Sequence, residues 1–187
     1  MKFVVGGAIS IVLLLVGASI FALAGGYNVA ATDAHNALTH WFLTMTTRRS
    51  VAVRAASVTA PAQFTHQQVA DGFSEFDEMC VNCHGAPGRE RGEVGKGLNP
   101  RPPDLAKASK EWTAAELFWI VKHGIKMTGM PAFGATHSDE RLWTLVAFLK
   151  ELPQLSSEKY VEMKRMSAAH GDGHDDHDHV HEEMPAK

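Results

Sequence analysis

The pentapeptide Cys80-Val81-Asn82-Cys83-His84 contains both cysteines of this 187-residue chain. Two thiols three positions apart lie on one helical turn, and a histidine follows them directly. This C-x-x-C-H pattern is the attachment signature of a c-type haem, in which each thiol adds to one vinyl group and the histidine ligates the iron. The pattern therefore predicts one covalent haem held by Cys80 and Cys83, with His84 as an axial ligand.

Other uses of a cysteine pair fit the chain less well. A thioredoxin-like redox pair belongs to a βαβ pattern, which the sequence does not contain. A structural zinc site needs about four ligands, and there is no second cysteine pair. A disulfide between Cys80 and Cys83 would close a very small loop and add little stability. The formal net charge of −3 gives no indication of a nucleic-acid partner.

An uncharged apolar run over residues 3–24 follows Lys2 at the start of the chain. A bilayer-spanning helix needs about 20 such residues, whereas the apolar part of a signal peptide has about 7–15. We therefore expect residues 1–26 to form an uncleaved transmembrane anchor, although Ala22-Leu23-Ala24 also resembles a signal-peptide cleavage site. Either reading exports the following residues, and we expect the haem domain on the periplasmic side of the inner membrane.

Residues 27–63 form a juxtamembrane segment and a linker. Apolar side chains at three- and four-residue spacing predict a helix within residues 32–56, with Asp33 as a candidate cap. Its aromatic residues, Trp41 and Phe42, precede three arginines. This pattern suits a helix on the membrane surface or against a partner subunit, and a simple spacer helix fits equally well.

Residues 64–155 carry three helical patterns and no convincing strand alternation, which predicts an all-α domain. The first runs from Gln67 to Cys80, and Gly72 within it indicates a close helix crossing. The second begins at a Thr113-x-x-Glu116 capping box and ends at Gly124. The third follows Ser138 and cannot continue far beyond Leu152 because Pro153 follows. The long loop 85–103 has no regular pattern, and we expect it to wrap the haem.

The iron needs a second axial ligand, and Met130 is the candidate. It lies in the Gly- and Pro-rich stretch 127–134, between two predicted helices. A thioether favours Fe(II) and raises the reduction potential relative to two histidines. Met127 and His123 remain alternatives, as do another histidine and an open site.

Four segments carry a family resemblance: residues 76–85, 99–105, 124–133 and 142–149. In this order, over residues 64–155, they make the chain similar to the small monohaem class I cytochromes c of bacteria, in a membrane-anchored form. The resemblance implies an all-α class I cytochrome c fold around one covalently bound haem, with its first and last helices crossing at near right angles. Gly72 and Phe76 would then meet the last helix near Trp143.

The resemblance also implies the surroundings of the iron. A backbone carbonyl of the proline loop, at Pro100, Pro102 or Pro103, would accept a hydrogen bond from Nδ1 of His84 and fix the imidazole. The cofactor-binding set is thus Cys80, Cys83, His84, Met130, Pro102 and Pro103, with His84 and Met130 as the iron ligands. Trp119 and Phe133 would line the haem pocket, or serve as ordinary core residues.

The implied function is one-electron transfer between redox proteins that are themselves membrane-bound, so the chain is expected to be an electron carrier of a respiratory chain and not an enzyme. The main alternative is a dedicated haem c subunit of a larger membrane oxidoreductase. A haem-based ligand sensor is a further alternative, which requires an open or labile sixth ligand position.

The C-terminal residues 156–187 are rich in histidine and aspartate and are expected to be a disordered tail. Five histidines in it are candidates for binding Zn²⁺, Cu²⁺ or Ni²⁺: His170, His174, His177, His179 and His181. The simpler reading is a solvated tail with adventitious metal affinity.

Overall fold

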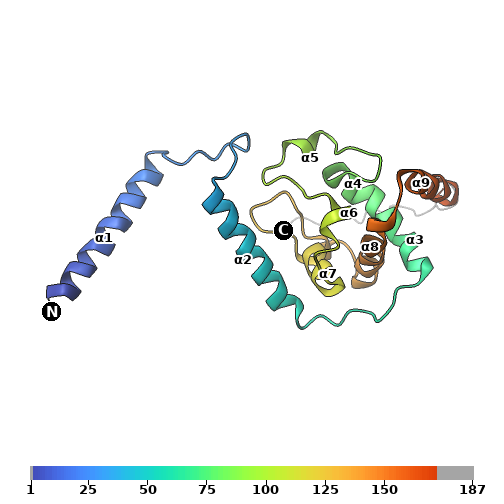
Figure 1. Ribbon diagram of the computed structural model, residues 1–187, viewed down its shortest axis with the longest axis horizontal. Helices are drawn as coiled ribbons and strands as arrows, with labels where there is room; N and C mark the ends of the chain where they lie inside the picture. Colours follow the sequence, from blue (N-terminus) through green and yellow to red (C-terminus); the bar gives the residue numbers. More distant parts are fainter. Residues whose placement is uncertain (1, 172–187) are drawn as a thin grey trace, which may run out of the picture.

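The computed structural model describes residues 2–171, which fold into helices joined by loops (Figure 1). The longer helices are α1 (Lys2–Leu23), α2 (Ala37–Ala55), α3 (His66–Glu75), α7 (Ala114–His123), α8 (Asp139–Glu151) and α9 (Ser157–Gly171). The short ones are α4 (Val81–His84), α5 (Glu93–Gly97) and α6 (Leu105–Ala108), with the π turn η1 (Phe76–Cys80) and the 3-10 turns η2 (Phe133–Ala135) and η3 (Leu152–Gln154). Within residues 2–171 there is no β-strand, which confirms the all-α prediction.

Helices α3 and α8 cross in the centre of the domain, and Gly72 makes the close approach possible. A Cβ atom added at Gly72 would lie 1.9 Å from the carbonyl oxygen of Thr144, the neighbour of Trp143. Phe76 packs against Phe148 on α8, with ring centroids 5.0 Å apart. The predicted contact of Gly72 and Phe76 with the helix that contains Trp143, here α8, is therefore confirmed.

The core surrounds this crossing and is closed by α7. Trp143 of α8 stacks on Phe118 of α7, with ring centroids 4.1 Å apart. Helix α7 begins at the predicted capping box, in which Thr113 and Glu116 bond reciprocally, and ends at Gly124 with φ of 63°. Helix α8 ends at Glu151 and passes into η3, where Pro153 lies, as expected.

Helix α1 is the one helix within residues 2–171 that is long and apolar enough to cross a membrane. Its side chains are exposed, and it extends away from the domain in Figure 1. Residues 24–36 connect it to α2, whose N-cap is Asn36. The prediction that Asp33 caps this helix is wrong: the side chain of Asn36 accepts the bond from Thr39 N–H.

The prediction of a disordered tail from residue 156 is wrong for its first part. Residues Ser157–Gly171 form α9, and Tyr160 is buried in the main core cluster. Tyr160 packs against Phe73, with ring centroids 5.3 Å apart, so this contact anchors the helix to α3. The remaining tail histidines, His174, His177, His179 and His181, lie outside the described residues.

Candidate haem-attachment site

A π turn contains Cys80 and leads into the short helix α4, which contains Cys83. Helix α3 begins at a capping box between Thr65 and Gln68 and runs into η1, where the N–H of Val81 donates to the carbonyl of Phe76. The sequence pattern predicted one continuous helix to Cys80, and this π turn is a difference that periodicity does not reveal. Such turns are frequent at functional sites, because they change the direction in which the following side chains project.

Cys80, the last residue of this turn, and Cys83, on α4, are free cysteines three positions apart. Cys80 is buried and Cys83 is partly buried. Burial raises the pKa of the Cys80 thiol to about 12, and the nearby Cys83 and Glu75 add to the effect. Reactive redox cysteines instead have lowered pKa values. The environment of Cys80 therefore argues against a thioredoxin-like redox pair.

His84 is held by a backbone carbonyl of the proline loop. Its Nδ1–H donates to the carbonyl oxygen of Pro103 at 2.8 Å, so Pro103 is the acceptor among the three prolines expected for this bond. Pro102, next to it, is partly buried. The bond fixes the ring and leaves Nε2 as the nitrogen with a free lone pair.

The electrostatics around His84 favour its neutral form. Burial lowers the pKa of His84 most, the bond to Pro103 opposes this, and the positive charge of Arg91 lowers it further, with a net lowering. A neutral imidazole is the form that binds a metal. The ring is therefore both oriented and in the protonation state that an iron ligand requires.

Glycines let the loop after His84 pack tightly on the attachment helix. Gly85 ends α4 with φ of 73°, a left-handed conformation that favours glycine. A Cβ atom added at Gly95, on α5, would lie 2.5 Å from the carbonyl oxygen of Cys83. Gly92 N–H donates to the carbonyl of Asn82 at 2.9 Å. The loop 85–103 is thus folded back against the cysteines and is partly helical at α5.

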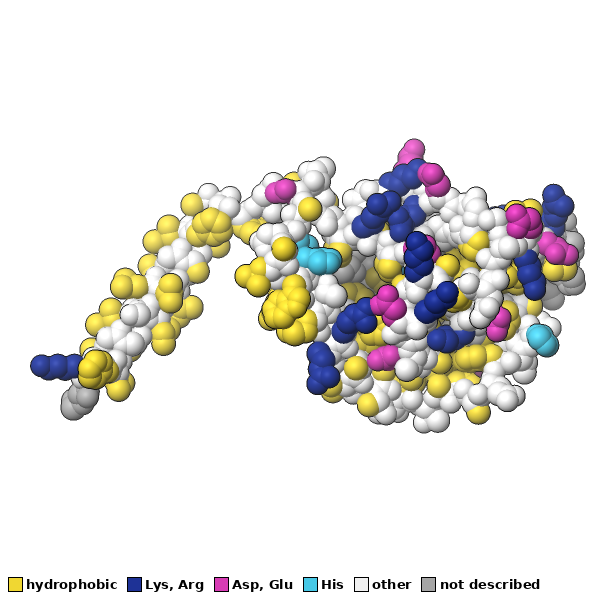
Figure 2. Space-filling view, viewed as in Figure 1, with side chains coloured by type: hydrophobic (Ala, Val, Ile, Leu, Met, Phe, Trp, Pro, Cys, Tyr) yellow, Lys and Arg dark blue, Asp and Glu magenta, His cyan; other side chains and the backbone are white. Residues whose placement is uncertain are grey.

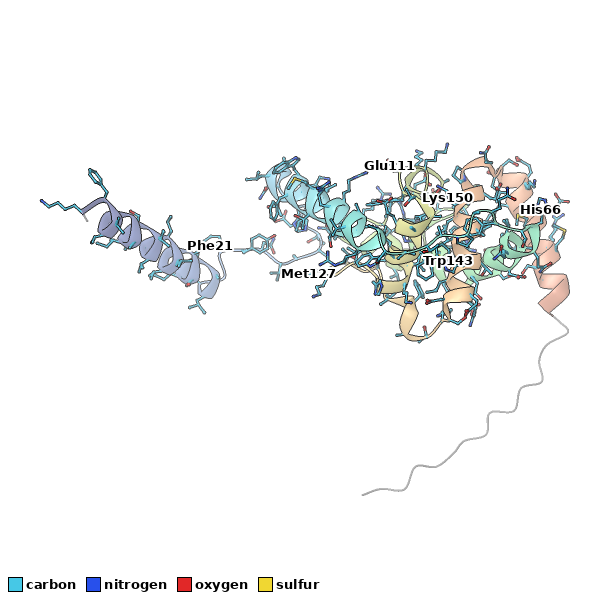
Figure 3. The ribbon with its side chains drawn as sticks, turned by 90° about the horizontal axis from the view of Figure 1, so that it is seen from below. Phe21, His66, Glu111, Met127, Trp143 and Lys150 are labelled. Atoms are coloured by element: carbon cyan, nitrogen blue, oxygen red, sulfur yellow. The ribbon has the colours of Figure 1, made fainter. Side chains whose placement is uncertain are left out.

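The two methionines of the predicted ligand loop differ in exposure. Met130 is partly buried against the core, and its N–H donates to Oγ1 of Thr128 at 3.1 Å. Its carbonyl accepts from Ile125 N–H at 3.2 Å, which closes the loop after α7. Met127 is 94% exposed and has φ of 59°. In Figure 3 it lies at the edge of the domain, whereas Trp143 lies within it.

The remaining predicted residues lie around α7 and η2. His123 is exposed and packs against Trp119, with ring centroids 4.8 Å apart. Phe133 is partly buried against the core and meets His137 edge-on at 5.7 Å. These contacts account for both aromatic residues as packing groups, and a role for them in lining the haem pocket stays a prediction.

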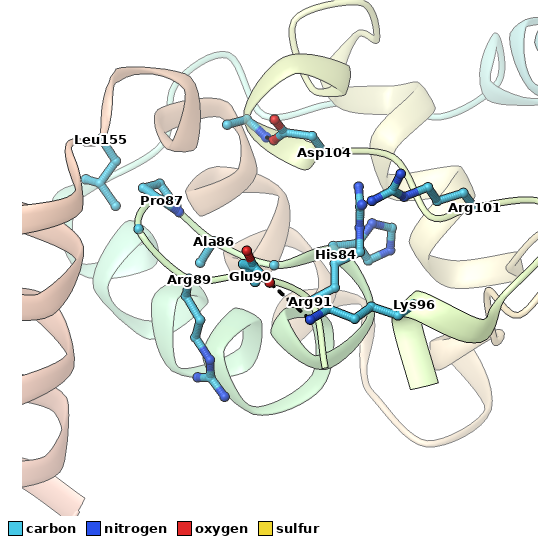
Figure 4. A pocket seen from close by; sticks show the side chains of 13 residues that line it. His84, Ala86, Pro87, Arg89, Glu90, Arg91, Lys96, Arg101, Asp104 and Leu155 are labelled. Atoms are coloured by element: carbon cyan, nitrogen blue, oxygen red, sulfur yellow. Dashed lines mark hydrogen bonds and ion pairs between the residues drawn. The ribbon is translucent and has the colours of Figure 1, made fainter. Parts of the chain in front are cut away.

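A basic hollow of about 540 Å³ lies beside His84 (Figure 4). Its lining includes Arg89, Arg91, Lys96 and Arg101. The Nε atom of Arg91 is buried without a hydrogen-bond partner in the described part of the chain. Sequence reasoning did not single out these residues, although the Arg89-Glu90-Arg91 stretch was a visible signal.

These groups together fit a covalently bound haem. The two thiols lie within one turn, the imidazole presents a free nitrogen, and the unpartnered Nε of Arg91 is available to an anionic group. Cysteine sulfurs, an imidazole and a thioether are the groups that attach and ligate a c-type haem.

Comparison with known proteins agrees with this site. Residues 67–149 match the family model described as cytochrome c oxidase, cbb3-type, subunit III. No curated protein matches the chain. The matched segment runs from α3 to α8, so it contains the cysteines, His84 and Met130, and it excludes α1, α2 and α9. Residues 67–149 of this chain are therefore a c-type cytochrome domain, of a family that binds covalent haem c.

Proposed function

We propose that the chain is a membrane-tethered electron carrier with one haem c. Cys80 and Cys83 hold the haem, and His84 and Met130 ligate its iron. When bound, the haem supplies a one-electron Fe(III)/Fe(II) couple, and the protein provides orientation, burial and tuning of the potential.

The observation that carries this proposal is the 2.8 Å bond between Nδ1 of His84 and the carbonyl of Pro103. A metal-ligating histidine typically donates its other ring N–H to a carbonyl or carboxylate, which orients the ring and raises its basicity. The match to a cytochrome family supports the same reading.

Met130 is the proposed second ligand because its side chain is packed inward. A soft ligand must leave water to reach the iron, and Met130 is partly buried, whereas Met127 is exposed. The loop is held closed by the Ile125–Met130 and Met130–Thr128 bonds, which limit the positions that this side chain can adopt.

We place the haem domain on the periplasmic side of the inner membrane, with α1 as its anchor. A tether confines the domain to a thin layer near the bilayer, which raises its effective concentration around membrane-bound donors and acceptors. Electron transfer to such partners would then be fast without tight binding.

A second candidate is a dedicated haem c subunit of a larger membrane oxidoreductase. The description of the matched family, subunit III of a cbb3-type oxidase, favours it. Extraction in mild detergent distinguishes the two: a carrier should elute alone, and a subunit should elute in a stable complex with other redox proteins.

The test of the proposed function is an absorption spectrum of the purified, exported protein, oxidised and then reduced. Sharp reduced α and β bands, with haem that stays on the denatured chain, are the expected result. Haem that is lost on denaturation would contradict attachment at Cys80 and Cys83. Covalent haem that binds carbon monoxide readily when reduced would instead support a sensor with a labile sixth position.

A further inference from the structure

Helix α2 has two apolar sides, and the domain covers one of them. Val51 and Ala55 are buried, 1% and 3% exposed, where the C-terminal half of the helix contacts α7. Arg48 pairs with Glu111 and lies 5.2 Å above the ring of Trp112. These contacts fix α2 to the cytochrome domain, so it is not a simple spacer.

The opposite side of α2 carries large apolar side chains that the domain does not cover. Phe42 lies nine positions before Val51, and at 100° per residue it projects from the other side of the helix. Leu38, Trp41, Phe42, Met45 and Val53 are all exposed. We call this set the outer face of α2. Figure 2 shows hydrophobic side chains gathered over this part of the molecule.

The charge of α2 is entirely positive. The helix contains Arg48, Arg49 and Arg54 and has no aspartate or glutamate. Arg49 has no acidic partner among residues 2–171. A shallow groove of about 470 Å³ also lies along the helix, and its lining combines Trp41 and Met45 with His40, Thr44, Arg48 and Arg49. Apolar and cationic groups side by side are the chemistry that binds the interface of an anionic bilayer.

The position of α2 in the chain brings it to the bilayer. Only residues 24–36 separate it from α1, and a fully extended segment of this length spans at most about 45 Å. Tryptophan is the residue most typical of the membrane–water interface, and Trp41 is 58% exposed on the outer face.

We infer that α2 lies on the surface of an anionic lipid bilayer, with its outer face among the acyl chains and Arg49 at the headgroup phosphates. Because the inner side of the same helix is packed on α7, the helix holds the cytochrome domain in one orientation toward the membrane. Two helices, α1 and α2, then attach the domain to the bilayer.

The test uses the full-length haem-loaded protein in nanodiscs that contain lipid and no other protein. A nitroxide spin label is attached at Phe42→Cys on the outer face, or at Glu162→Cys, an exposed control position on α9. The unmodified protein is the labelling blank, since its two cysteines are both in the haem motif. A blank that takes up label would count against haem attachment and not against the bilayer contact.

The expected result is that the label at position 42 is reached more readily by oxygen than by a water-soluble nickel chelate, and that position 162 shows the reverse. Equal nickel accessibility at the two positions would overturn the inference. If the label at position 42 were protected from the nickel chelate in native membranes but not in lipid-only nanodiscs, the inference would also be overturned, in favour of a protein partner.

The anionic component is tested by changing the lipid. With phosphatidylglycerol present, Arg49→Gln should reduce the protection of position 42, and in phosphatidylcholine alone it should have little effect. The same loss of protection in both lipids would contradict the assignment of Arg49 to the headgroups.

Discussion

The hydroxyl of Tyr160 donates a 2.5 Å hydrogen bond to Oδ1 of Asp77, and this bond joins α9 to the π turn that contains Cys80. Lys164 donates to the other carboxylate oxygen at 2.6 Å, and Arg89 lies 3.5 Å from Asp77. Asp77 is three residues before Cys80. Helix α9 is therefore bound to the turn that leads into the proposed attachment site, although it lies outside the segment that matches the cytochrome family.

Removal of the Tyr160 hydroxyl should destabilise the protein. Tyr160→Phe keeps the ring contacts with Phe73 and Phe76 and loses a bond to a charged acceptor, so we expect a loss of about 1–3 kcal/mol in the free energy of unfolding. Tyr27→Phe is the matched control, because Tyr27 is exposed. Denaturant unfolding of the full chain in detergent measures both, and equal midpoints would contradict the role of the Asp77 bond.

Acid should weaken the hydrogen bonds and ion pairs that surround Asp77. Burial raises the pKa of Asp77, but the bonds from Lys164 and Tyr160 and the charges of Lys164 and Arg89 outweigh it, so the pKa is lowered from its ordinary value of 3.8. The ionised carboxylate therefore stabilises the fold above about pH 4, and this stability is lost as the pH falls toward the lowered pKa. Asp77→Asn should have a lower free energy of unfolding than wild type at pH 7, and this difference should shrink below pH 4. Denaturant unfolding of both proteins over this pH range measures it. A difference that stays constant with pH would contradict this.

The crossing of α3 and α8 should tolerate no side chain at Gly72. Because the added Cβ of Gly72→Ala would lie 1.9 Å from the Thr144 carbonyl, the helices must separate, and we expect a loss of about 3 kcal/mol or more in the free energy of unfolding. Gly97→Ala, where a Cβ meets nothing within 4 Å, is the control and should be neutral. Thermal unfolding followed by circular dichroism compares the two variants.

Helix α2 offers a matched pair of valines for testing its attachment to the domain. Val51 is 1% exposed and Val53 is 67% exposed, two positions apart on one helix. With the full chain in detergent, Val51→Ala should lower the free energy of unfolding by about 1–3 kcal/mol, and Val53→Ala should have little effect. Equal effects would mean that α2 does not pack on α7 in solution.

Local patterns were sufficient to predict much of the domain. The Thr113–Glu116 box, Gly124 and Pro153 delimit α7 and α8 because capping and backbone restriction depend on a few adjacent residues. Gly72 indicated the helix crossing, since a glycine inside an amphipathic helix costs helix propensity and needs a packing reason. The bond from His84 to the proline loop was expected from the family resemblance and not from a local pattern, and Pro103 is the acceptor.

The features that the sequence did not predict depend on contacts between distant residues. The polar composition of residues 156–171 indicated disorder, yet Tyr160 is buried and bonds to Asp77, and Lys164 bonds to the same carboxylate, so that α9 is anchored. The side of α2 that faces the domain packs through Val51 and Ala55, and two such residues give only a weak apolar periodicity in the sequence. The π turn before Cys80 changes the hydrogen-bond register without changing the apolar pattern.

The ligand loop contains its own control for the proposed iron site. Met130 is partly buried and Met127 is 94% exposed, so only one of the two side chains is packed toward the core. Met130→Ala should remove the weak long-wavelength band of methionine–iron ligation in the oxidised protein and lower the reduction potential, because the soft thioether favours Fe(II). Met127→Ala should leave both unchanged. If Met127→Ala alone removes the band, the ligand is Met127; if neither variant changes it, the sixth ligand is not a methionine of this loop. The haem should remain covalently attached in both variants, since Cys80 and Cys83 are intact, and this separates a ligand change from a loss of the cofactor.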